Sequence, residues 1–290
     1  MKKSRKLATL GICSALFLGL AACQQQHATS EGTNQRQSSS AKVPWKASYT
    51  NLNNQVSTEE VKSLLSAHLD PNSVDAFFNL VNDYNTTVGS TGLSGDFTSF
   101  THTEYDVEKI SHLWNQKKGD FVGTNCRINS YCLLKNSVTI PKLEKNDQLL
   151  FLDNDAIDKG KVFDSQDKEE FDILFSRVPT EATTDVKVHA EKMETFFSQF
   201  QFNEKARMLS VVLHDNLDGE YLFVGHVGVL VPADDGFLFV EKLTFEEPYQ
   251  AIKFASKEDC YKYLGTKYAD YTGEGLAKPF IMDNDKWVKL

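Results

Sequence analysis

The sequence lacks the patterns that mark several common protein classes. Its 290 residues include only five cysteines, with no Cys-x-x-Cys pair and no His-Glu-x-x-His segment, so a zinc site has little support. It contains no internal repeat, and its basic runs beyond the N-terminus are short. We therefore expect no metal, no cofactor and no nucleic-acid partner, since nucleic-acid binding needs a basic surface.

The N-terminus carries the one long apolar run. Residues 2–6 are mostly basic, and residues 7–22 are apolar but too short for a comfortable membrane span of ~20 residues. The run ends in Leu-Ala-Ala-Cys, which resembles a lipobox with Cys23 as the lipidated residue. We predict a lipoprotein signal peptide at 1–22 and a lipid on Cys23 that anchors the chain to the extracellular face of the cell membrane.

The next segment, residues 23–44, is rich in Gln and Ser and has few apolar residues, which predicts a disordered tether. The remaining residues, 45–290, are enough for one large domain with a substantial core. Removing the four basic residues of the signal takes the formal net charge from −9 to −13. This acidity disfavours nonspecific adsorption to an anionic wall or membrane.

Within 45–290, helical signals come first and strand signals come later. Capping residues and apolar spacing predict helices at 57–69, 71–84, 104–116, 126–135, 167–175, 185–200 and 257–268. Alternating β-formers predict strands at 149–152, 208–214, 221–231, 236–243, 250–254 and 279–282. Residues 136–163 are otherwise expected to be irregular, and their acidic run Asp153–Asp155 is typical of a turn. This order implies an α+β domain in which helices pack on an antiparallel sheet.

Cys126 is the first candidate for chemistry. It follows Gly123-Thr124-Asn125 and is expected to begin a helix, where unpaired N–H groups and the helix dipole favour a thiolate. The alternative is a small buried cysteine, the usual state of a free thiol. Cys126 and Cys132 lie on different faces of one predicted helix and cannot readily bridge.

His226 and Glu241 lie on consecutive predicted strands. Gly225 and Gly228 flank the histidine, which suggests a close approach to the backbone there. A four-residue turn at 232–235 would put His226 directly opposite Glu241, where a carboxylate can orient an imidazole. A five-residue turn would instead put Lys242 opposite His226, and a core histidine with some other partner is the alternative interpretation.

A cysteine at a helix start, then a histidine on a strand and an acid on the next strand, resembles papain-like cysteine peptidases and amidases, particularly NlpC-type wall hydrolases. The Asn-Cys-Arg and Gly-His-Val-Gly segments also resemble an uncharacterised family of Gram-positive lipoproteins. The resemblance implies a papain-like α+β fold, with Cys126 as nucleophile, His226 as general base and acid, and Glu241 as orienter. The glutamine that often completes the oxyanion hole is missing, and Asn125 and Gln116 are weak substitutes.

Three hypotheses for the function follow. The first is a membrane-anchored cysteine hydrolase or transferase that acts on amide bonds, with a cell-wall peptide as the expected substrate. The second is a non-catalytic binding lipoprotein on a papain-like scaffold, because a fold does not determine a function. The third is a structural envelope protein whose chemistry is limited to a disulfide between Cys126 and Cys260.

Overall fold

The computed structural model describes residues 45–100 and 103–290, so the predicted signal peptide 1–22, Cys23 and the tether 23–44 lie outside the described residues. The helices are α1 Gln55–Ser66, α2 Pro71–Val88, α3 Val107–Lys118, α4 Cys126–Leu134, the 3-10 turn η1 Gln148–Leu150, α5 Phe151–Gly160, α6 Ser165–Leu174, α7 Val186–Phe197 and α8 Lys257–Lys267. The strands are β1 Ala47–Thr50, β2 Thr98–Ser99, β3 Val178–Pro179, β4 Arg207–Asp215, β5 Tyr221–Ala233, β6 Gly236–Lys242, β7 Tyr249–Phe254, β8 Phe280–Asp283 and β9 Lys286–Val288.

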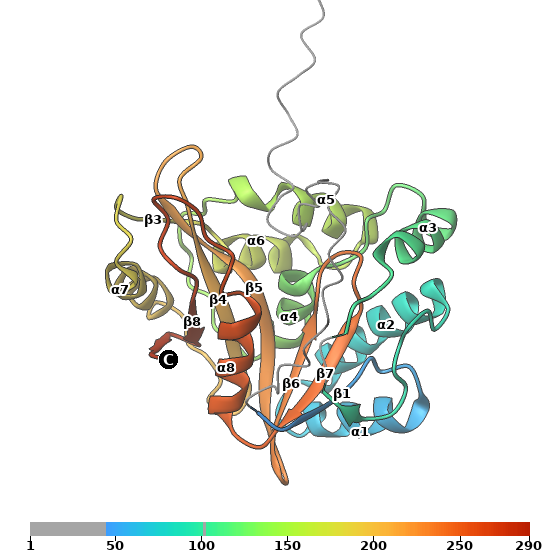
Figure 1. Ribbon diagram of the computed structural model, residues 1–290. Helices are drawn as coiled ribbons and strands as arrows, with labels where there is room; N and C mark the ends of the chain where they lie inside the picture. Colours follow the sequence, from blue (N-terminus) through green and yellow to red (C-terminus); the bar gives the residue numbers. More distant parts are fainter. Residues whose placement is uncertain (1–44, 101–102) are drawn as a thin grey trace, which may run out of the picture. The chain divides into compact units, whose positions relative to one another are not determined.

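The strands form one antiparallel sheet in the order β2-β1-β7-β6-β5-β4-β8-β9, with β3 paired to β5. The long strands β4 to β7 occupy its centre and are joined as consecutive neighbours (Figure 1). The predicted α+β class with helices on an antiparallel sheet is therefore confirmed. The short strands β1, β2, β3 and β9 were not predicted, since strands of a few residues carry little periodicity.

Local sequence explains where the helices begin and end. At α2, the Asp70 side chain accepts hydrogen bonds from the N–H groups of Asn72 and Ser73, and Pro71 occupies the first turn. The helix ends at Gly89, whose φ of 63° is the left-handed conformation that glycine adopts freely. These capping residues explain both ends, although the predicted helix stopped at residue 84, four residues before Val88.

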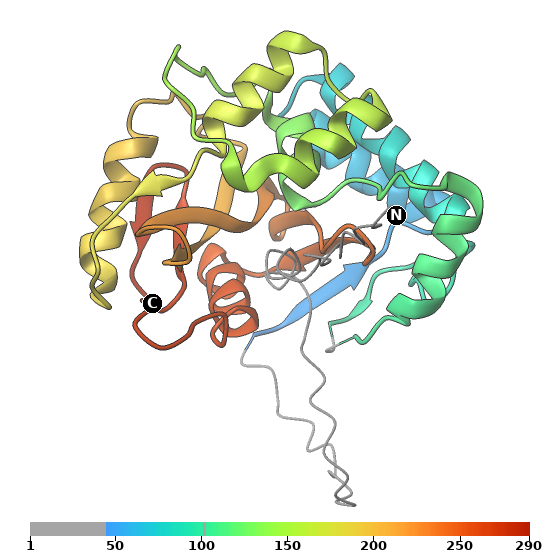
Figure 2. The ribbon, with the colours of Figure 1, turned by 90° about the horizontal axis from the view of Figure 1, so that it is seen from above.

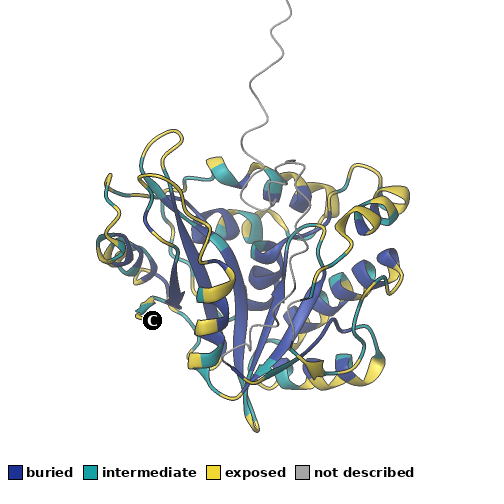
Figure 3. Ribbon diagram, viewed as in Figure 1, coloured by how far each residue is buried: buried dark blue, intermediate teal, exposed yellow. Residues whose placement is uncertain are grey.

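The sheet separates two apolar clusters. On one face, α1 to α6 cover residues such as Val229 of β5 and Val240 of β6. On the other face, α8 covers Leu230 and Phe239 with its own Leu264. Figure 2 shows α8 on the side of the sheet opposite α5 and α6, and Figure 3 shows that α4 and the central strands are the most continuously buried parts. The centre of the sheet is therefore enclosed on both faces.

One predicted segment is wrong. The expected strand at 149–152 is in fact η1 followed by α5, so residues 148–160 of the segment expected to be irregular are helical. The acidic run Asp153–Asp155 lies inside α5 rather than in a turn. Asp and Asn favour turns on average, but here the Asp153 carboxylate is buried and paired, and this tertiary contact is absent from the local pattern.

Candidate active site

Cys126 is the first residue of α4, as predicted. The side chain of Asn125 caps the helix by accepting a hydrogen bond from the Ile128 N–H at 3.1 Å. Cys126 is buried, with 5% of the residue exposed, and Ile128 and Tyr131 behind it are fully buried. The nucleophile candidate is therefore held at the start of a packed helix, where unpaired N–H groups and the helix dipole favour a thiolate.

His226 lies on β5 at an irregularity of the sheet. Along β4, Val211 pairs with His226 but Val212 pairs with Val224, so Gly225 has no partner on β4 and forms a bulge. The His226 ring stacks on Tyr268, the residue that ends α8, with ring centroids 4.8 Å apart. His226 is 1% exposed, so its ring is buried where β5 meets the end of α8.

Glu241 of β6 is the hydrogen-bond partner of His226. The distance from Nε2 to Oε2 is 2.6 Å, and the Glu241 side chain is fully buried. Tyr263 donates to the other carboxylate oxygen, and Lys267 Nζ lies 3.4 Å from that oxygen and 2.8 Å from the tyrosine hydroxyl. Burial opposes ionisation, but Lys267, His226 and Tyr263 together lower the pKa of Glu241 to about 2. The carboxylate is therefore charged and fully partnered.

The hairpin that joins β5 to β6 differs from the prediction by two residues. Ala233 pairs with Gly236 and Val229 pairs with Val240, so the turn consists of Asp234 and Asp235 alone. The ladder between β5 and β6 ends at Val229 and Val240, just before His226 and Glu241, and its register offsets these two residues by two positions. A shift of two residues keeps a side chain on the same face of a strand, so the predicted contact forms although its predicted register is wrong.

The imidazole of His226 also interacts with the Cys126 thiol. Because Nε2 is bonded to Glu241, Nδ1 is the nitrogen that remains for the sulfur. Burial disfavours the thiolate, yet the nearby charge of His226 and a hydrogen bond from it lower the pKa of Cys126. Burial likewise disfavours the imidazolium, but Cys126 and Glu241 raise the pKa of His226. The two shifts favour a thiolate–imidazolium pair.

Asp153 is a member of the site that the sequence did not reveal. It lies on α5, is fully buried, and accepts hydrogen bonds from Asn125 Nδ2 at 2.8 Å and from Arg127 Nε at 2.9 Å. These partners flank Cys126 on both sides. The one signal in the sequence was an aspartate between the apolar residues Leu150 and Ala156. Such spacing does not distinguish a buried helical aspartate from one in a turn.

The two substitute oxyanion donors are engaged elsewhere. Asn125 donates from Nδ2 to Asp153, and its Oδ1 accepts the hydrogen bond that caps α4. Gln116 is exposed on α3 and bonds to His112 at 2.9 Å. Neither side chain is free to act beside the thiol, so the backbone N–H of Cys126 is the donor that this helix start supplies.

The disulfide hypothesis is contradicted, because Cys126, Cys132 and Cys260 are all free and buried. Cys260 belongs to the apolar cluster on the α8 face, whereas Cys126 and Cys132 belong to the cluster on the other face. Burial raises the pKa of Cys132 to about 12 and raises that of Cys260 well above its usual value. Of these three thiols, Cys126 alone has a lowered pKa.

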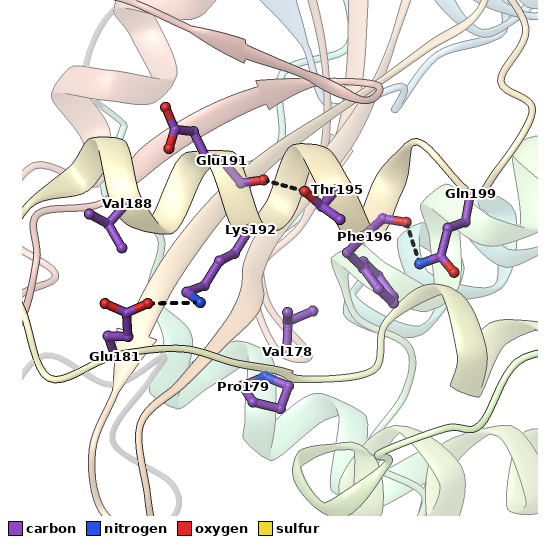
Figure 4. A pocket seen from close by; sticks show the side chains of 9 residues that line it. All are labelled: Val178, Pro179, Glu181, Val188, Glu191, Lys192, Thr195, Phe196 and Gln199. Carbon is purple, nitrogen blue, oxygen red and sulfur yellow. Dashed lines mark hydrogen bonds and ion pairs between the residues drawn. The ribbon is translucent and has the colours of Figure 1, made fainter.

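A groove of about 520 Å³ lies away from this constellation, between β3 and α7 (Figure 4). Val178 and Pro179 form one side, and Lys192 bridges to Glu181 across it at 3.1 Å.

Within the described residues, no group of three His, Cys, Asp or Glu side chains is placed to hold a metal ion. No helix in residues 45–100 or 103–290 is long and apolar enough to cross a membrane.

Fold and site together define an α+β protein with a buried Cys–His–Glu constellation. Residues 48–288 match the family described as "Domain of unknown function (DUF4300)", and the chain belongs to this family. The matched region contains Cys126, His226 and Glu241, so the constellation lies within the family domain. No curated protein and no solved structure matches the chain.

Proposed function

We propose that the protein is a membrane-anchored extracellular cysteine hydrolase or transferase that acts on amide bonds. One observation carries the proposal: Cys126 at the start of α4 meets His226, and the far nitrogen of that ring is 2.6 Å from the buried Glu241 carboxylate. A nucleophile, a base and an orienter in contact are the requirements for covalent acyl transfer.

In this mechanism the Cys126 thiolate attacks the amide carbonyl carbon, and the backbone N–H at the helix start stabilises the resulting oxyanion. The C–N bond then breaks, and His226 gives its proton to the leaving amine. The Cys126 thioester is hydrolysed by a water whose proton returns to His226, or it is transferred to an acceptor amine. Glu241 keeps the ring oriented and stabilises the imidazolium throughout.

The proposed fold is papain-like. The support is the chain order of the site: a helix-start cysteine on one face of an antiparallel sheet, then a histidine on β5 and an acid on β6. The proposed location rests on the sequence of the N-terminus, where a basic segment, an apolar run and Cys23 follow in the order of a lipoprotein signal. A cell-wall peptide is the substrate class that this location and the NlpC resemblance favour.

The test compares two cysteine variants on purified cell-wall peptides, with cleavage followed by mass spectrometry. Cys126→Ala is expected to lower turnover more than about 1000-fold, as loss of a nucleophile does. Cys132→Ala is the matched control, since that thiol is equally buried on the same helix and is expected to leave turnover within about threefold. Normal turnover by a folded Cys126→Ala protein would contradict the proposal.

A non-catalytic binding role is the second candidate, and burial favours it. Cys126 is only 5% exposed, His226 is 1% exposed, and the side chains of Asn125 and Gln116 are engaged elsewhere. Iodoacetamide separates the two roles without any substrate. Rapid labelling of Cys126 near pH 6 supports catalysis, whereas labelling that starts only near the ordinary thiol pKa of about 8.5 supports binding.

A further inference from the structure

Asp153 and Arg127 connect three elements of the candidate site. Arg127 follows Cys126 on α4, and its guanidinium meets the Asp153 carboxylate through two bonds, Nε to Oδ1 at 2.9 Å and Nη2 to Oδ2 at 2.7 Å. Its remaining nitrogen, Nη1, donates to the Val224 carbonyl at 2.9 Å. Val224 is two residues before His226 on β5, next to the bulge. One guanidinium thus links α5, α4 and the strand of the histidine.

The same carboxylate also holds the residue before the nucleophile. Asn125 Nδ2 donates to Asp153 Oδ1 at 2.8 Å, while Asn125 Oδ1 caps α4. Cys126 is therefore flanked by two residues tied to one fully buried carboxylate. A bidentate guanidinium–carboxylate pair fixes orientation as well as distance, because its planar fork permits one geometry.

We propose that Asp153 and Arg127 are positioning residues that set the separation of the Cys126 sulfur from the His226 ring. The inference rests on the proposed function, since it assigns the pair to that nucleophile and base. Asp153 places Arg127 and Asn125, Arg127 spans to the backbone of β5, and the bulge at Gly225 then presents His226. The pair acts through what it holds, namely the Asn125 side chain before the sulfur and the Val224 carbonyl on the strand of the ring.

Charge and geometry make opposite predictions here, which makes the inference testable. The Asp153 charge by itself raises the pKa of the Cys126 thiol, and the Arg127 charge lowers it. If Asp153 acted as a charge alone, Asp153→Asn would make the thiol more reactive. If it positions the thiol against the imidazole, the same change weakens the pair and makes the thiol less reactive at low pH.

The experiment measures iodoacetamide labelling of the full chain between pH 5 and 9, with peptide mass spectrometry to read Cys126 alone. We expect Asp153→Asn and Arg127→Lys each to slow labelling at pH 6 about tenfold, which is one pKa unit. Arg127→Lys keeps the charge and loses the fork, so a charge-only role predicts no change. Removing one partner of a buried pair is strongly destabilising, so Asp153→Asn can fail to fold. In that case Arg127→Lys alone tests the inference.

Asp172→Asn is the matched control. Asp172 of α6 is a buried aspartate that, like Asp153, binds one cationic side chain and one asparagine: Lys145 at 2.6 Å and Asn154 of α5 at 3.0 Å. Its carboxylate bonds to Lys145 and Asn154 rather than to the residues that flank Cys126, so labelling is expected to stay within about twofold of wild type. Unchanged or faster labelling in folded Asp153→Asn and Arg127→Lys proteins overturns the positioning role.

Failure of this inference differs from failure of the proposed function. If the wild-type thiol reacts at low pH and both variants do the same, the positioning role is wrong and the hydrolase proposal stands. If the wild-type thiol reacts only near pH 8.5, there is no activated pair to position, and both proposals are contradicted.

Discussion

Replacing Glu241 with glutamine tests the electrostatics at the centre of the site. The carboxylate is fully buried and accepts hydrogen bonds from His226 and Tyr263, with Lys267 beside it. Glutamine keeps the size of the side chain and one acceptor oxygen but removes the charge. The substitution therefore isolates what the ionised form contributes to folding.

The magnitude follows from the shift in pKa. The pKa of Glu241 falls from 4.5 to about 2 on folding, which corresponds to about 3 kcal/mol of stability at neutral pH. Because the folded-state pKa lies below the unfolded value, this stability is present above pH 4.5 and is lost as the pH falls toward 2. An independent argument agrees, since removing one partner of a buried ion pair costs ~3–5 kcal/mol.

Urea unfolding of wild type and Glu241→Gln at pH 7, 5, 4 and 3 measures how much the ionised carboxylate contributes to the free energy of unfolding. The difference in unfolding free energy is expected to be about 3 kcal/mol at pH 7 and to shrink steadily below pH 4.5. Glu220→Gln is the control: Glu220 bonds to His214 at 2.7 Å but is 30% exposed, so ~1 kcal/mol or less is expected. A Glu241→Gln difference that stays constant down to pH 3 would refute the assignment of an ionised Glu241.

Two further predictions concern the same strands. In Gly228→Ala a new Cβ would lie 2.3 Å from the Phe239 ring and 2.8 Å from the Val240 carbonyl, so we expect a loss of ~1–3 kcal/mol in thermal unfolding. No loss would show that β5 and β6 separate there more easily than the structure indicates. Burial lowers the pKa of Lys242 to about 7 from 10.5, so the unfolded chain binds more protons between these values and stability rises with pH across that window. Lys242→Met is expected to reduce this rise in urea unfolding, and an unchanged rise would contradict the lowered pKa of Lys242.

The fold class was predictable because its signals are local. The Asn125 cap, the glycine before it and the apolar spacing behind it predict a helix that begins at Cys126, where α4 begins. The alternation of β4 to β7 likewise predicts four consecutive antiparallel strands. In contrast, β1 pairs with β7 across about two hundred residues of chain, and no local pattern in a four-residue strand indicates such a partner.

The site was predictable in part, for a geometric reason. The pairing of His226 with Glu241 was predicted from a turn of four residues, and the real turn has two. Side chains alternate between faces with a period of two, so an error of two residues preserved the face and the contact survived. An error of one residue would have placed Lys242 on that face instead. The contact with Cys126 depends on the packing of α4 against β5, which hairpin arithmetic does not describe.

Gly225 shows how a local irregularity creates the site. Leu222 and Val224 face the α4 side of the sheet, and so do Val227 and Val229, although strict alternation would put one pair on the opposite face. The extra residue at Gly225 shifts the alternation by one, so both pairs can face the same side. A Cβ at Gly225 would lie 2.3 Å from the Leu213 side chain. His226 directly follows this residue, and its ring interacts with Cys126, bonds Glu241 through Nε2 and stacks on Tyr268 at the end of α8. A bulge can re-aim the side chain beside it, and here that side chain is the shared partner of the cysteine and the carboxylate.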